Sequence, residues 1–170
     1  MVSPRVLLAA AFVVVALAVQ VTMLARLPLP GATPDLLLLV VVGLALANGP
    51  GFGLAVGFCA GLALDLVPPA DHEIGRWALV LTLVGYLAGL ARGEARRSAF
   101  VPLVVVAAAA AASVLLYAGL GALMADSHVT WSAVGRLLPT AVLYDVVLSA
   151  FALPVILAWA ARVEPEAVPR

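Results

Sequence analysis

The sequence predicts an all-α integral membrane protein, a polytopic helical bundle of six transmembrane helices. Hydrophobic residues make up 65% of the chain and charged residues only 11%, which leaves too little polar surface to cover a water-soluble globule. The apolar residues fall in long runs separated by polar, proline-rich or glycine-rich segments. With spans of about 20 residues and short connections, a chain of 170 residues accommodates about six helices. We therefore expect one integral membrane domain over residues 1–170, with no room for a separate soluble enzyme domain.

Charge and cysteine content exclude further classes of protein. The formal net charge is zero and the basic residues are scattered among the predicted loops, so the chain lacks the basic patch of a nucleic-acid-binding protein. Cys59 is the only cysteine, which excludes an intramolecular disulfide and a metal site built from cysteines. We expect no nucleic-acid partner and no cofactor.

The first predicted helix covers residues 6–25. Its apolar run is longer than the hydrophobic region of a typical signal peptide and lacks an A-x-A-like cleavage site near its end, so a retained helix is favoured over a signal peptide. Three prolines between residues 28 and 34 then require a loop at the membrane surface.

The next two predicted helices, 35–48 and 51–67, are short for a hydrocarbon core of about 30 Å. Either Thr33 or Asp35 can cap the first of them. A tight turn at Asn48-Gly49-Pro50-Gly51 joins the two, so an antiparallel hairpin is favoured over a re-entrant pair.

A stripe of glycines organises the second helix of this hairpin. Gly53, Gly57 and Gly61 recur every four residues, which places them on one helix face, and Asp65 follows at the next step. Such a face lets another helix approach closely within a membrane. We expect these residues to form a helix-packing or partner-binding surface.

Three further helices are expected at residues 77–91, 100–124 and 132–161. The first carries a second small-residue face, which could receive the glycine stripe, with Tyr86 beside it. The last is long enough for its first turns to lie in the membrane interface, and two internal prolines would bend it. The residues singled out in these helices are Gly85, Tyr86, Gly89, Tyr144 and Asp145.

Two acids within apolar surroundings need an explanation, because an ionised carboxylate at mid-membrane costs at least a few kcal/mol. For Asp65, a partner contact and a cap or loop anchor are equally favoured. Asp145 lies deeper in its apolar segment, so a functional or bundle-stabilising ionic role is favoured, for which an Arg or a Tyr is a candidate partner. Neither acid forms a recognisable catalytic dyad, and His72 and His128 are expected to be solvated loop side chains rather than metal ligands. No catalytic residue is predicted.

The loop arginines predict the orientation in the membrane. With six spans, Arg26, Arg76 and Arg136 fall on one side, and the other six arginines fall on the opposite side, which should be cytoplasmic. Both termini then face the cytoplasm, and Asp35 and Asp65 lie toward the outer surface. The arginines of the richer side are Arg5, Arg92, Arg96, Arg97, Arg162 and Arg170.

Several segments read together resemble the rod shape-determining protein MreD family. They are Pro34-Asp35 with the leucine-rich run after it, the core Gly57-Phe58-x-x-Gly61-x-x-x-Asp65-Leu66, and Gly75-x-x-Ala78-Leu79 with Tyr86-Leu87. The chain length, the expected number of spans and the late proline-containing helix agree with that family.

The resemblance implies a non-catalytic component of the bacterial cell-elongation machinery in the inner membrane. Members of the family are thought to bind the MreC scaffold and to work with MreB, RodA and a penicillin-binding transpeptidase in peptidoglycan synthesis. The fold of the family also resembles the substrate-binding S-component of energy-coupling-factor (ECF) vitamin transporters, which supplies the alternative function. A scaffold predicts small-residue grooves without a ligand cavity, whereas an S-component requires an outward-opening polar pocket.

Overall fold

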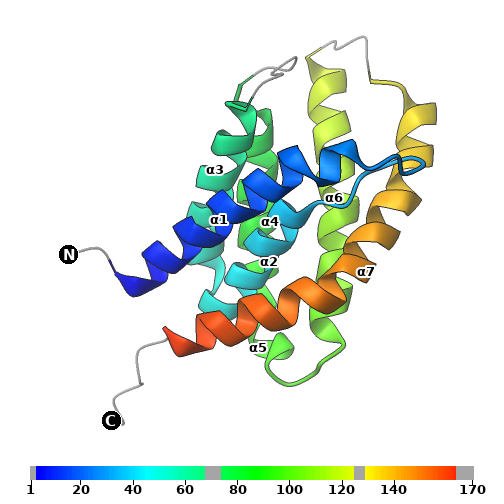
Figure 1. The fold of residues 1–170 in the computed structure, drawn as a ribbon. Coiled ribbons are helices and arrows are strands. Elements are labelled where there is room, and N and C mark those ends of the chain that lie inside the picture. Colours follow the sequence, from blue (N-terminus) through cyan, green and yellow to red (C-terminus); the bar gives the residue numbers. More distant parts are fainter. Residues whose placement is uncertain (1–2, 68–73, 125–128, 164–170) are drawn as a thin grey trace.

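The computed structural model describes residues 3–67, 74–124 and 129–163, and within these ranges the chain is helical without strands (Figure 1). Most of the longer helices begin at or just after a proline, a glycine or a polar residue. The helices are α1 Pro4–Thr22, η1 Leu24–Arg26, α2 Leu36–Asn48, α3 Pro50–Asp65, α4 Arg76–Leu90, α5 Arg92–Ala95, α6 Val101–Leu123 and α7 Trp131–Arg162.

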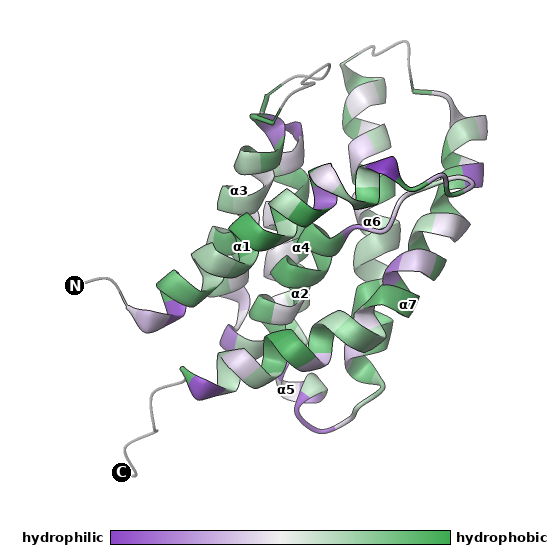
Figure 2. Cartoon of the chain, viewed as in Figure 1, coloured by the Kyte–Doolittle hydropathy of each residue, from purple (hydrophilic) through white to green (hydrophobic). Residues whose placement is uncertain are grey.

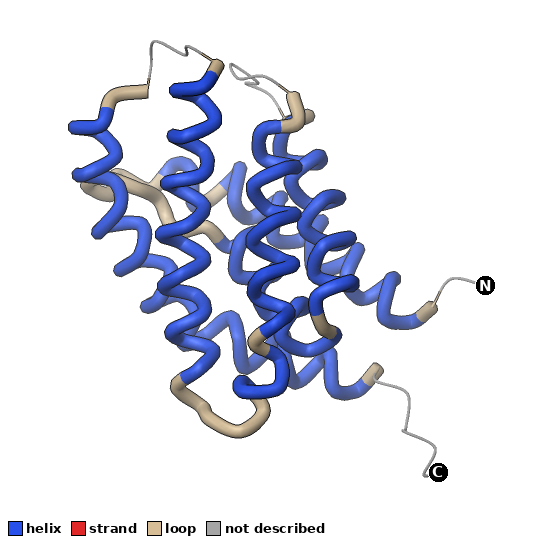
Figure 3. Tube along the Cα trace, turned by 180° about the vertical axis from the view of Figure 1, so that it is seen from behind, coloured by secondary structure: helices blue, strands red, loops and turns tan. Residues whose placement is uncertain are grey.

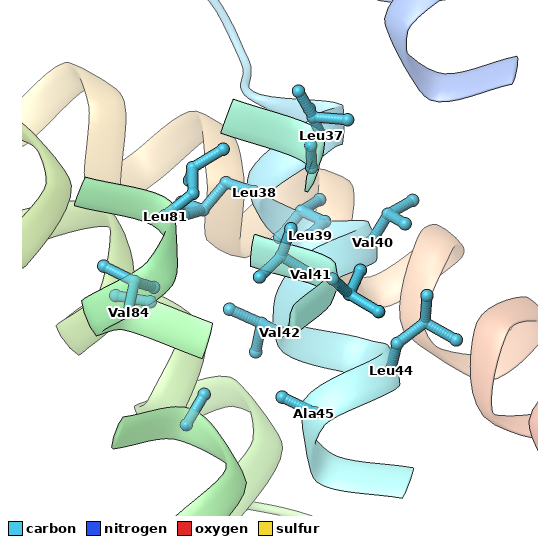
Figure 4. Packing of buried hydrophobic residues seen from close by; sticks show 14 of the residues in the cluster. Leu37, Leu38, Leu39, Val40, Val41, Val42, Leu44, Ala45, Leu81 and Val84 are labelled. Atoms are coloured by element: carbon cyan, nitrogen blue, oxygen red, sulfur yellow. The ribbon is translucent and has the colours of Figure 1, made fainter. Parts of the chain in front are cut away.

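Helix α2 is the centre of the bundle. Its sequence has no polar face, and residues 37–46 are all buried, as expected of a helix that is apolar all round. It contacts α1, α3, α4, α6 and α7. Leu38, Val41 and Val42 lie on the side of α2 that faces Leu81 and Val84 of α4 (Figure 4).

A single residue turns the chain from α2 into α3. Gly49 has a φ of 98°, a conformation that residues with a side chain rarely adopt, and Pro50 then opens α3 at a position where its missing N–H costs nothing. The two helices therefore run antiparallel directly after the turn.

Helix α3 packs most extensively against α4, and the glycine stripe lies in that contact. A Cβ atom added at Gly53, Gly57 or Gly61 would overlap the backbone carbonyl oxygen of Gly85, Leu81 or Trp77, respectively. The two helix backbones thus touch along three turns, which only glycine permits.

Three helical segments are long and apolar enough to cross a membrane by length and composition: Pro4–Arg26, Val101–Leu123 and Trp131–Arg162. Helices α2, α3 and α4 are apolar but shorter. Hydrophobic residues colour most of the helical surface, and hydrophilic residues gather mainly near helix ends (Figure 2). This distribution suits a protein whose solvent is lipid.

The long helices α1 and α7 cross the bundle obliquely, whereas α3, α4 and α6 run nearly parallel to one another (Figures 1 and 3). The start of α1 and the end of α7 lie on the same side of the molecule (Figure 3). Pro139 and Pro154 lie inside α7, which continues through both.

Candidate functional site

Asp65, the last residue of α3, is fully buried and holds the start of α4. Its Oδ2 accepts hydrogen bonds from the backbone N–H groups of Gly75 (2.9 Å) and Ala78 (3.1 Å), and its Oδ1 accepts one from Trp77 (3.1 Å). The first N–H groups of a helix have no partner within the helix, and a carboxylate there also faces the positive end of the helix dipole. This geometry corresponds to the cap or loop anchor, and it leaves the Asp65 carboxylate inaccessible to a partner in this structure.

Arg76 and Tyr117 join α4 to α6 beside this cap. Arg76 is 6% exposed, and its Nε and Nη2 donate to the carbonyl oxygen of Tyr117 at 3.1 and 2.7 Å. Its guanidinium lies 3.7 Å from the centre of the Tyr117 ring, and the Trp77 ring lies 4.5 Å from the same ring. The sequence places Arg76 among the loop arginines, because nothing in the local pattern indicates a carbonyl acceptor 41 residues away.

Asp35 and Asp145 meet at the start of α2, although 110 residues separate them. Asp35 caps α2 by accepting a hydrogen bond from Leu38 N–H at 2.9 Å. Asp145 is 2% exposed, and its Oδ1 accepts from the backbone N–H of Asp35 at 2.6 Å. The hydrogen bond that the structure gives the Asp145 carboxylate thus comes from a backbone N–H, where an Arg or a Tyr was the expected partner.

The neighbouring polar side chains hold the loop that leads into α2. Gln20 of α1 donates to Pro34 O (3.1 Å) and accepts from Leu36 N–H (2.8 Å). From α7, Tyr144 donates its hydroxyl to Pro30 O at 3.2 Å, and Thr140 Oγ1 accepts from Ala32 N–H at 3.0 Å. Residues 30–36 are thus fixed between α1 and α7 mostly through backbone groups.

Trp77, beside the Asp65 cap, and the Asp35–Asp145 contact both border one cavity of about 550 Å³. Its walls come from α1, the loop before α2, the end of α3, the start of α4, α6 and α7. The polar residues in its lining are Gln20, Thr33, Asp35, Trp77, Ser113 and Asp145. A scaffold is expected to lack such a cavity. No local sequence pattern marks it, because residues from six segments form it together.

The structure separates the predicted site residues into two groups. Gly53, Gly57, Gly61, Gly85 and Gly89 lie in the contact between α3 and α4, while the lining of the cavity includes Asp35 and Asp145. Tyr86 is 41% exposed on the outer side of α4, away from both groups.

No group of three or more His, Cys, Asp or Glu side chains suited to a metal ion occurs in residues 3–67, 74–124 and 129–163. The predictions for His72 and His128 concern residues outside these ranges.

The long apolar helices indicate the class of this protein, an all-α integral membrane protein. The family model of rod shape-determining protein MreD matches residues 3–161, which is most of the chain. The protein belongs to the MreD family, and membership implies a role in rod shape determination. The comparisons with curated proteins and with solved structures give no match.

Proposed function

We propose that this protein is a non-catalytic scaffold of the cell-elongation complex that binds MreC and supports peptidoglycan synthesis. MreB, RodA and a penicillin-binding transpeptidase are the further members of that complex. The observation that carries the proposal is the family match over residues 3–161. The burial of the conspicuous polar groups in cap and loop contacts is in keeping with a structural role.

The proposed location is the bacterial inner membrane, with six spans and both termini in the cytoplasm. The three long segments would be full spans, and α2, α3 and α4 would cross as a packed group in which neighbouring helices absorb the mismatch in length. The short helix α5 and its arginines lie at the end of the bundle that we assign to the cytoplasm (Figure 1).

The proposal is tested by crosslinking in native membranes followed by affinity purification of a tagged chain. Recovery of MreC and the transpeptidase is the expected result, and depletion of the protein should round the cells. A tagged membrane protein of similar size and unrelated function serves as the control for nonspecific recovery. Purification without any wall-synthesis protein, together with normal cell shape on depletion, would refute the scaffold function.

The cavity favours one alternative function, a substrate-binding S-component of an ECF vitamin transporter. Its volume of about 550 Å³ falls in the usual range for small-molecule sites. Co-purification with an energising ATPase pair, together with tight binding of a vitamin-like molecule, would establish that alternative in place of the scaffold.

A further inference from the structure

The cavity between α1, α4, α6 and α7 has apolar walls and a carboxylate-rich end. Val21, Leu64, Trp77 and Leu137 contribute to the walls. The two acids of the lining are Asp35, which caps α2, and Asp145 of α7. At about 550 Å³ the cavity is larger than a single side chain needs and suits a small organic molecule.

No basic side chain among the described residues that line the cavity faces the carboxylates of Asp35 and Asp145. Asp145 is 2% exposed, and the hydrogen bond from Asp35 N–H goes to its Oδ1. A carboxylate offers about four acceptor positions, so this one bond leaves capacity for a further donor. The start of α2 supplies the equivalent of about half a positive charge, which alone would not balance two ionised carboxylates.

We propose that this cavity is a binding site for a small molecule that carries a positively charged nitrogen on an apolar body. The ammonium or guanidinium group would lie at Asp145 and Asp35, where it would donate to the remaining acceptor positions and stabilise the ionised carboxylates. The apolar part would lie along the walls. The site goes beyond the scaffold function and does not depend on it, since the binding measurement uses the purified chain alone.

Trp77 in the cavity wall provides the measurement. Replacing Trp131 and Trp159, which are 65% and 49% exposed, by Phe leaves Trp77 as the single tryptophan. The variant is reconstituted in nanodiscs of phosphatidylglycerol, a lipid without an amine, and titrated with 2-phenylethylamine. We expect a saturable change in fluorescence, and the neutral analogue 2-phenylethanol and the anionic analogue 3-phenylpropanoate should bind at least about tenfold more weakly.

Asp145→Asn in the same background should weaken binding of the amine by at least about tenfold and leave the affinity for 2-phenylethanol unchanged. Glu94→Gln, on the exposed α5, is the matched control and should change neither affinity. If Asp145→Asn does not fold, Asp35→Asn replaces it, because Asn is an equally good helix cap without the charge.

A second lipid arm identifies the source of the amine. If phosphatidylethanolamine in the nanodiscs weakens binding of 2-phenylethylamine to the parent and not to Asp145→Asn, a lipid headgroup is the natural occupant; if it has no effect, a soluble amine is. The proposal is overturned if the amine gives no saturable change, if the neutral analogue binds equally well, or if the carboxylate variant used binds the amine like the parent.

Discussion

At the scale of single residues, the Asp65 carboxylate has the clearest energetic role, because it accepts three backbone N–H groups at the start of α4. Asp65→Ala would leave these buried donors without that acceptor, and we expect a loss of about 2–4 kcal/mol of stability. Asp65→Asn should lose less, since one amide oxygen can still accept. Thermal unfolding of the purified variants in detergent measures the effect.

The control for this prediction is Glu94→Ala, which removes an exposed ion pair to Arg97 at 3.4 Å. Exposed pairs contribute little to stability, so the unfolding temperature should stay close to that of the wild type. An Asp65→Ala protein as stable as Glu94→Ala would mean that the cap contributes no net stability.

The sequence identified Asp35, Asp65 and Asp145 as unusual because charge in an apolar run is conspicuous by itself. It named Asp35 as a candidate helix cap, as the structure has it, but it could not assign the partners of Asp65 and Asp145. The donors to Asp65 and Asp145 are backbone N–H groups, which every residue except proline carries, so no side-chain pattern marks them. The partner of Asp145 is also 110 residues away, which places the contact beyond any local signal.

At the scale of helices, the contact between α3 and α4 depends on the absence of side chains. Gly57→Leu would place a side chain against the backbone of Leu81 and Thr82, which cannot move away without separating the helices. We expect misassembly and faster degradation in cells, even though the hydropathy of α3 rises. Steady-state protein level and thermal stability in detergent are the measurements.

Gly119→Leu is the matched control, because an added Cβ at Gly119 in α6 meets nothing within 4 Å. This variant makes the same chemical change in another apolar helix and should accumulate normally. Equal levels of the two variants would show that the close contact at Gly57 is dispensable.

The sequence predicted the helices more readily than their packing. Prolines, glycines and polar segments mark where apolar runs must stop, and the structure places the helix ends within a few residues of the expected ones. The central place of α2 had a weaker signal, because a helix that is apolar all round looks the same whether lipid or protein surrounds it. The short α5 was not expected, since it lies within a charged connection.

At the scale of the whole molecule, the distribution of arginines and the order of the apolar helices together predict one topology in the membrane. The arginine-rich connection after α4, the start of α1 and the end of α7 should face the cytoplasm, and the connection between α3 and α4 should face outward. An even number of crossings brings the two ends of the chain to one side, in keeping with the common side on which α1 begins and α7 ends (Figure 3).

Cysteine labelling in intact cells tests this topology. In a Cys59→Ala background, single cysteines at Ser3, Ile74 and Val163 report the start of α1, the connection before α4 and the end of α7. Ile74 is 68% exposed, so its cysteine should react with a membrane-impermeant maleimide from outside. The cysteines at Ser3 and Val163 should react only after permeabilisation, because the arginines beside them hold both ends in the cytoplasm. Labelling of one end alone from outside would require an odd number of spans, and labelling of both ends with protection of Ile74 would invert the orientation.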